Sequence, residues 1–291
     1  MLFGIALDFV MRSSSESSLG INWLPDKKLG DLDFADDLCL LAPNVEIMQR
    51  KTTALSDTAS KIGLNINIKK TEVMSTEGPI NISLNNENLK QVEKFTYLGS
   101  TITSDGDCLH DVKARIAKAY GAMNKLNNIW KSNSLSKNTK LKIFNSNVMS
   151  VLLYGSDSWK TNAEIERRLT SFQCRCLRRI LSIKWNTRTS NLEVLRISEM
   201  ESVTSLARRN RWNYLGHVLR MPTTRIPVQA WSWTPDGRRQ VGRPRGTLRR
   251  TITDDLRKCG NKYINLKRTA DDRAKWRGLV SSLCSNVGTG R

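Results

Sequence analysis

The amino-acid sequence predicts an α+β fold. A small antiparallel sheet with one packed helix is expected over residues 1–105, followed by an all-α bundle over 106–185 and a basic, mainly helical and loop region over 186–291. Three observations support this order. Short apolar runs and strict alternation of apolar and polar residues are frequent in the first segment, as in β-strands. Apolar residues then recur every three or four positions, and beyond residue 186 arginines are interleaved with glycine, proline and tryptophan.

The first segment predicts one clear helix among several short strands. Apolar residues between 45 and 62 have helical spacing, Pro43-Asn44 can cap this helix, and Gly63 can end it. Residues 2–11 have the character of the last turns of a helix. Strands are predicted at 21–23, on both sides of Asp36-Asp37, at 64–68 with 69–74, at 81–89 and at 95–99.

Three apolar stripes predict the helical bundle. They comprise Val112, Ile116, Ala119, Met123, Leu126 and Trp130; Leu141, Phe144, Val148 and Leu152; and Ile165, Leu169, Phe172, Cys176 and Ile180. The breaks at 132–136 and 155–161 are short enough to connect neighbouring helices of a bundle. A last helix is predicted at 271–284.

Charge is unevenly distributed along the chain. The net charge of +20 over 291 residues divides into −4 for residues 1–105 and +24 for residues 106–291. An acidic segment followed by a strongly basic one predicts a metal-using site joined to a surface that binds a polyanion. The apolar start is too short to span a bilayer, no secretion signal is evident, and the six dispersed cysteines form no disulfide pattern. We therefore expect an intracellular protein, cytoplasmic or nuclear, that is not secreted and has no membrane partner.

The most informative feature is the pair Asp36 and Asp37 between two apolar runs, 32–35 and 38–42, which is typical of a tight hairpin with the aspartates at its turn. Adjacent carboxylates framed by buried strands would repel each other unless they shared a cation, and their oxygen atoms suit Mg²⁺. Aspartate is also common in ordinary turns, so spacing alone leaves the metal site open. A calcium-binding EF-hand loop starting at Asp31 is excluded, because the glycine and glutamate that it requires are absent.

Six segments occur in an order that is specific as a combination: FADD (34–37), GLNINIKKTEVM (63–74), FTYLGSTIT (95–103), GHVLRM (216–221), W-x-P-x-G-R-R (233–239) and GRPRGTLRRTI (242–252). With these segments the chain resembles the reverse transcriptases of non-long-terminal-repeat (non-LTR) retrotransposons, in the RTE-like or a related group. The resemblance implies that residues 1–105 are part of a polymerase palm and that 106–185 are the helical thumb, which closes on the product duplex. Residues 186–291 would then be a C-terminal nucleic-acid-binding region.

The resemblance also implies roles for individual residues. Asp36 and Asp37 match the catalytic, metal-binding pair, and Phe34 would pack near the primer terminus. Lys70 matches a lysine near the leaving pyrophosphate that is placed to act as its general acid; Lys69 is the competing candidate, and an ordinary exposed lysine is the alternative reading. The primer grip, which steers the primer 3′ end, is matched by Phe95, Thr96, Tyr97, Leu98 and Gly99, where core packing is compatible with the same residues.

One departure from the family affects activity. Polymerases of this kind also use an Asp from a neighbouring strand far upstream, and in this sequence that strand would precede Met1. We therefore expect Mg²⁺ to be shared with an Asp outside this sequence, and the chain to be catalytically incomplete by itself. The missing N-terminal part of the polymerase is an expected partner, because an unpaired sheet edge favours association. Zinc is not expected, since Cys174 and Cys176 would point to different sides of a helix.

The basic C-terminal region is expected to bind an RNA template and DNA primer, or an RNA–DNA duplex. Residues 208–250 contain eleven arginines and one acidic residue, with aromatic residues between them. Arginines bind phosphates and aromatic rings stack on unpaired bases, although Trp212, Trp231 and Trp233 could equally fill a domain core. The expected phosphate contacts are Arg208, Arg209, Arg211, Arg243, Arg245, Arg249 and Arg250.

Three functions stay open at this point. The first is a fragment of an RNA-directed DNA polymerase of a retrotransposon. The second is a non-catalytic nucleic-acid-binding protein derived from such an element. The third, a nuclease that uses Asp36 and Asp37, is the weakest, because no general base or further acidic ligand is evident nearby.

Overall fold

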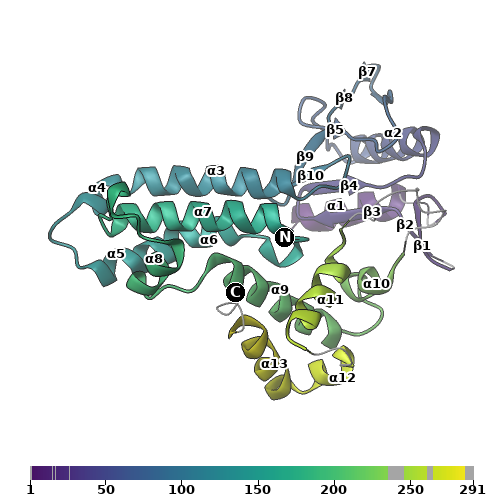
Figure 1. Cartoon of the computed structure of the whole chain (residues 1–291). Helices are drawn as coiled ribbons and strands as arrows, with labels where there is room; N and C mark the ends of the chain where they lie inside the picture. The colour runs from purple at the N-terminus through teal and green to yellow at the C-terminus, as the bar shows by residue number, and fades with distance from the viewer. Residues whose placement is uncertain are drawn as a thin grey trace. The chain divides into compact units, whose positions relative to one another are not determined.

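The computed structural model describes residues 2–14, 16, 18–25, 27–234, 246–260 and 265–285 (Figure 1). The described residues form two compact units. Unit 1 contains those up to Asp107 together with Trp233 and Thr234, and unit 2 contains the others from Cys108 onward. The chain thus changes from strands to helices close to the predicted position. Within these ranges, no helix combines the length and the apolar character needed to cross a membrane.

The described part of unit 1 contains two helices, α1 (Leu2–Ser14) and α2 (Val45–Lys61), and five short strand pairs. Four pairs are antiparallel: β1 (Ile21–Leu24) with β2 (Lys27–Leu29), β3 (Asp31–Phe34) with β4 (Asp37–Leu40), β6 (Ser83–Leu84) with β7 (Glu87–Asn88), and β9 (Lys94–Tyr97) with β10 (Ser100–Thr103). The fifth pair, β5 (Glu72–Val73) with β8 (Lys90–Gln91), is parallel. The strands therefore form separate ladders instead of one small antiparallel sheet.

The predicted strand at 64–68 is wrong. Residues 64–67 belong to no ladder among the described residues, and a turn begins at Ile68. The alternation comes from packing, because Leu64, Ile66 and Ile68 point into the cores of unit 1 while the two asparagines between them are exposed. Period-two burial alone does not show that a neighbouring strand is present.

Helix α2 supports the aspartate hairpin, β3–β4. The Asn44 side chain caps α2 by accepting a hydrogen bond from the Ile47 amide at 2.9 Å, and Gly63 follows the helix with φ = 78°. Val10 and Met11 of α1 pack with Leu55 and Ala59 of α2 in one apolar cluster. Leu38 and Leu40 of β4 pack against this cluster, so the hairpin is anchored by one apolar side.

Trp233 belongs to unit 1, although the helices on both sides of it in the sequence belong to unit 2. Its ring stacks on Trp23 of β1 with the centroids 5.3 Å apart, and its Nε1 donates a hydrogen bond to the Asn22 carbonyl at 3.1 Å. Trp233 therefore serves to attach the chain to the β1–β2 ribbon.

Unit 2 is helical, and the three apolar stripes and the last helix are confirmed (Figure 1). Its described elements are α3 (Leu109–Lys125), α4 (Asn127–Lys131), α5 (Lys137–Phe144), the π-helix η1 (Asn145–Met149), α6 (Ser150–Leu153), the 3₁₀ turn η2 (Ser156–Ser158), α7 (Ala163–Ile180), the 3₁₀ turn η3 (Trp185–Thr187), α8 (Asn191–Ser198), α9 (Val203–Arg220), α10 (Ile226–Ser232), α11 (Leu248–Lys258), α12 (Leu266–Asp271) and α13 (Arg273–Ser285).

Two apolar cores lie along unit 2. The first is formed by helices α3 to α8 and includes Phe144, Trp159 and Phe172. The second is formed by α9, α11, α12 and α13 around Trp212 and Trp276. Helix α9 joins the two cores, because Val203 at its start packs in the first and Trp212 packs in the second.

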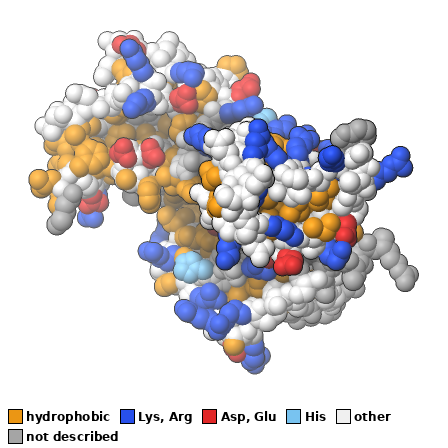
Figure 2. Space-filling model, turned by 90° about the vertical axis from the view of Figure 1, so that its left-hand side faces the viewer, with side chains coloured by type: hydrophobic (Ala, Val, Ile, Leu, Met, Phe, Trp, Pro, Cys, Tyr) orange, Lys and Arg blue, Asp and Glu red, His pale blue; other side chains and the backbone are white. Residues whose placement is uncertain are grey.

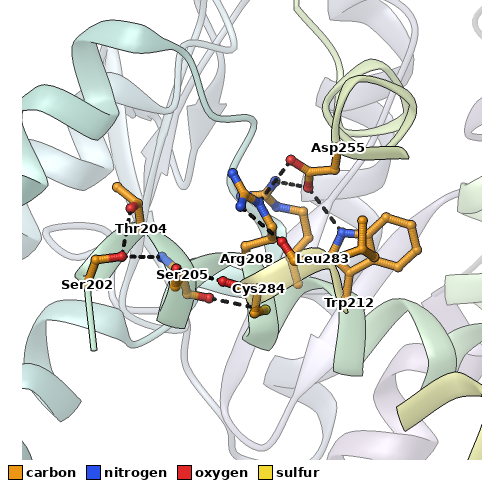
Figure 3. A network of polar contacts seen from close by, with 9 residues as sticks. Ser202, Thr204, Ser205, Arg208, Trp212, Asp255, Leu283 and Cys284 are labelled. Carbon is orange, nitrogen blue, oxygen red and sulfur yellow. Dashed lines mark hydrogen bonds and ion pairs between the residues drawn. The ribbon is translucent and has the colours of Figure 1, made fainter. Parts of the chain in front are cut away.

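A buried ionic cluster ties α9 to α11 and α13 (Figure 3). The Asp255 carboxylate of α11 accepts hydrogen bonds from Arg208 Nε, Arg211 Nη1 and Trp212 Nε1, each at 3.1 Å. Arg208 also donates to the Leu283 carbonyl of α13 at 3.2 Å. The three charged side chains are all less than a tenth exposed, so one carboxylate pairs with two guanidinium groups that are removed from water.

We predict that Asp255→Ala destabilises unit 2 by about 3 kcal/mol or more, because two buried guanidinium groups lose their only counter-charge in this cluster. Urea unfolding followed by tryptophan fluorescence measures the change, and Trp212 is a reporter within the cluster. The matched control is Asp254→Ala, which removes a half-exposed carboxylate paired with Arg257 and should change stability by about 0.5 kcal/mol at most. Equal effects of the two variants would contradict this role of the cluster.

Candidate functional site

The predicted aspartate hairpin is confirmed. Phe34 pairs with Asp37 at the end of the β3–β4 ladder, and Ala35 and Asp36 form the two-residue turn. Ala35 has φ = 56°, a left-handed conformation that is unfavourable for a residue with a Cβ atom. The turn therefore stores backbone strain directly beside the aspartate pair.

The side chains of Asp36 and Asp37 are both exposed and form no hydrogen bond or ion pair with the described residues. Water therefore solvates these two carboxylates, and burial does not force them to share a cation. Their free carboxylate oxygens still fit a hard cation such as Mg²⁺, which keeps several waters and takes further oxygen ligands from substrate phosphates. In the described ranges, no group of three acidic, histidine or cysteine side chains is close enough to enclose a metal ion.

Tyr97 connects the aspartate hairpin to the candidate primer-grip hairpin. Its hydroxyl donates a hydrogen bond to the Leu32 carbonyl of β3 at 2.9 Å. Burial raises the pKa of Tyr97, and Cys39, Asp33 and Asp37 raise it further, so the phenol stays neutral and remains a donor. The structure thus brings the predicted primer-grip segment to the hairpin that carries the candidate metal ligands, through the strand that precedes its turn.

The other primer-grip residues form the hairpin β9–β10. Phe95 and Thr96 lie on β9, while Leu98 and Gly99 form its turn with φ = 48° and 79°. Both central residues of a type I′ turn have positive φ, which suits the right-handed twist of the strands. Thr96 and Leu98 are exposed, and Phe95 is half-buried, so part of this hairpin is available to a ligand.

Lys70 and Phe34 are also accessible. Lys70 lies in the turn that follows residues 64–67, and not in a strand as predicted. Lys69 and Lys70 are both exposed and form no ion pair with a described residue, so the structure does not distinguish between the two candidates. Phe34 is 64% exposed next to the turn and leaves a free aromatic ring beside the aspartate pair.

The expected phosphate contacts of the C-terminal region fall into different environments. Arg208 and Arg211 are buried against Asp255, so their guanidinium groups cannot reach a phosphate while unit 2 is folded, and we assign them a structural role instead. Arg209 is bound to Glu201 at 2.7 Å, whereas Arg249 and Arg250 are exposed on α11. Arg243 and Arg245 lie outside the described residues.

The tryptophans of this region are mostly structural. Trp212 is fully buried in the second core, and Trp231 packs against that core. Cys174 and Cys176 of α7 are buried as well, and burial raises the pKa of Cys176 to about 12, which disfavours the thiolate form that binds zinc.

Sequence reasoning missed a basic surface formed by α3 and α7. The two helices run side by side, as the Tyr120–Phe172 ring contact at 4.6 Å and the hydrogen bond from Arg179 to Asn124 at 3.1 Å show (Figure 1). Apart from Arg179, five exposed cations of these helices form no ion pair or side-chain hydrogen bond with the described residues. We define the α3–α7 surface by these five residues: Lys113, Lys118, Lys125, Arg167 and Arg175.

Few acidic groups offset the positive charge of the α3–α7 surface. Glu164 lies at one end of it, and Arg168 neutralises this carboxylate at 2.7 Å. On the face of the molecule drawn in Figure 2, Lys and Arg side chains are more numerous than Asp and Glu. The basic positions of α3 and α7 could have been found from their spacing, but the sequence does not show that these two helices are neighbours.

Comparison with known proteins gives information on the origin of this chain. It is 26% identical over 276 residues to an uncharacterized transposon-derived protein of Caenorhabditis elegans, a match that covers 89% of this chain and 98% of that protein. The UPF0412 protein YaaI of Salmonella typhimurium is 28% identical over 112 residues, which cover 36% of this chain and 84% of that protein. A domain of unknown function, DUF6451, matches residues 122–154. The near full-length similarity to the first protein supports a transposon origin for this chain.

We predict that Ala35→Gly raises the free energy of unfolding of unit 1 by about 1 kcal/mol, because glycine adopts the left-handed conformation of the turn without a Cβ clash. Chemical denaturation, followed by the exchange of β3 and β4 amides, measures the effect. The matched control is Ala54→Gly inside α2, which should lower stability by about 1 kcal/mol. A loss of stability in both variants would show that the turn is not strained.

Proposed function

We propose that this chain is part of the RNA-directed DNA polymerase of a non-LTR retrotransposon. In this proposal it binds the template–primer duplex and contributes Asp36 and Asp37 to a two-metal site for nucleotidyl transfer. The observation that carries the proposal is the junction of two hairpins: the free carboxylate pair lies at the turn of one, and Tyr97 of the other hydrogen-bonds to Leu32 of the first. The similarity to a transposon-derived protein adds independent support for the origin.

The residues of the hairpin have distinct tasks in this proposal. Magnesium, when bound, neutralises charge on the phosphates and orients the attacking oxygen. Asp36 and Asp37 supply oxygen ligands from a strained, well-defined turn, and Phe34 lies beside them with its ring exposed to the primer end. Tyr97 fixes the candidate primer grip against β3, so that the primer end and the carboxylates keep one relative position.

The α3–α7 surface is the proposed binding site for the nucleic-acid backbone. Its five free cations lie on two adjacent helices, and exposed cations of this kind attract a phosphate backbone and release its counterions. In the C-terminal region, Arg209, Arg249 and Arg250 remain proposed phosphate contacts. Arg208 and Arg211 are no longer among the proposed contacts, because both are buried against Asp255.

We predict that the chain alone does not extend a DNA primer on an RNA template with Mg²⁺, and that a separate polymerase segment that carries a further catalytic Asp restores extension. The reason is that two-metal chemistry needs a carboxylate beyond Asp36 and Asp37. Asp36→Ala should lower the restored rate by at least about 100-fold. The matched control, Asp57→Ala on the exposed side of α2, should keep it. Restored extension that survives Asp36→Ala would exclude the aspartate pair from catalysis.

A second prediction concerns the binding surface. If the five cations of the α3–α7 surface contact phosphates, log K for an RNA–DNA duplex should fall against log salt concentration with a slope of about −4 or steeper. Arg175→Gln should make that slope about one unit less steep and weaken binding to all sequences alike. Arg273→Gln, which removes an exposed arginine of α13, is the control that should leave the slope unchanged. A flat salt dependence in the unmodified chain would exclude phosphate contacts.

A further inference from the structure

Lys51 of α2 is a buried lysine next to the aspartate hairpin. The residue is 4% exposed, and its ammonium group donates to the backbone carbonyls of Leu19 at 3.3 Å, of Leu41 at 3.1 Å, and of Gly30. An ammonium group has three donors, so each of them has an acceptor. Burial of a charge without such partners would cost several kcal/mol.

The three acceptors lie where the hairpin leaves the rest of unit 1. Gly30 directly precedes β3 and Leu41 directly follows β4, while Leu19 lies just before β1. The Leu41 amide also donates to the Gly30 carbonyl at 2.7 Å. Lys51 therefore binds the backbone at the ends of both strands of the hairpin, opposite to the turn that carries Asp36.

The fit around the ammonium group is close. A Cβ atom at Gly30 would lie 2.9 Å from Lys51 Nζ and 2.9 Å from the Leu19 carbonyl oxygen, so the backbone can approach the ammonium only because this residue is glycine.

Two carboxylates offset the burial of Lys51. Burial lowers the pKa of Lys51, whereas Asp31 and Asp33 of β3 raise it. Conversely, burial and Asp31 raise the pKa of Asp33, and Lys51 lowers it. The charged lysine and the acidic strand thus stabilise each other's ionised forms. A methionine would fill the same space without a desolvation cost, so packing alone does not account for a lysine at this position.

We propose that Lys51 is a positioning residue for the Asp36–Asp37 pair: by binding the Leu19, Gly30 and Leu41 carbonyls, it fixes the base of the hairpin and thereby the place of the two carboxylates. The proposal rests on the proposed function for the role of the carboxylates. In this role Lys51 does not contact the metal ion; it fixes the backbone that carries the metal ligands, as the groups around a metal ligand fix its orientation.

The test uses the full chain with three variants and one control. Lys51→Met removes the charge and the donors at similar length, and Lys51→Arg restores both. Gly30→Ala keeps the lysine but places a methyl group 2.9 Å from its ammonium nitrogen. Lys61→Met, an exposed lysine at the end of the same helix, is the control. Hydrogen–deuterium exchange of residues 31–41 and binding of Mn²⁺, followed by electron paramagnetic resonance, are measured where circular dichroism shows folded protein.

We expect Lys51→Met and Gly30→Ala to exchange about tenfold faster in residues 31–41 and to bind Mn²⁺ about tenfold more weakly, without faster exchange in α7. Lys51→Arg should recover most of both losses, because arginine restores the charge and the donors. If Lys51 only filled space, recovery would not depend on restoring a cation. Exchange in Lys51→Met as slow as in Lys61→Met would overturn the proposal. If the unmodified chain binds no Mn²⁺, the metal part of the proposed function fails, while the exchange comparison still decides the role of Lys51.

Discussion

The β3–β4 hairpin has strands of only four residues, and a ribbon of that length has little stability of its own in water. It therefore depends on the apolar contact of Leu38 and Leu40 with α1 and α2. That contact buries one side of the hairpin and leaves the turn exposed, which is how Asp36 and Asp37 can be both well placed and accessible. The Tyr97 and Lys51 contacts act on a hairpin that this apolar packing has already formed.

Residues of the same type have different roles in unit 2 because burial separates them. Arg211 is buried and serves Asp255, whereas Arg175 lies on an exposed helix face with no partner among the described residues. Along the sequence both are arginines in apolar–basic helices, and the density of arginines after residue 208 suggested phosphate contacts there. The acceptor of both Arg208 and Arg211 is Asp255, which lies more than forty positions further along the chain, so no local pattern reveals it.

Periodicity predicted the elements that depend on local rules. The hairpin turn at Asp36, the helix that Gly63 follows and the stripes of the helical unit can be predicted from the spacing of apolar residues and from turn chemistry. The strand at 64–68 failed because alternation reports which side is buried, and not whether a partner strand exists. The role of Lys51 was out of reach for a related reason, since its acceptors are backbone carbonyls from three loops, which have no signature in the sequence.

The distribution of charge constrains how such a chain can handle nucleic acid. The first 105 residues carry a net charge of −4, and four of their acids lie between Asp31 and Asp37, so a phosphate backbone is repelled there unless cations are present. Attraction to a polyanion must come from the residues after 105, with their net charge of +24. The proposed nucleic-acid binding and the proposed metal binding thus fall in different units, whose apolar clusters are separate. A substitution that affects one proposed function can therefore leave the other intact, as long as the substituted residue is not part of a core. Metal binding and nucleic-acid binding can then be measured independently in one chain.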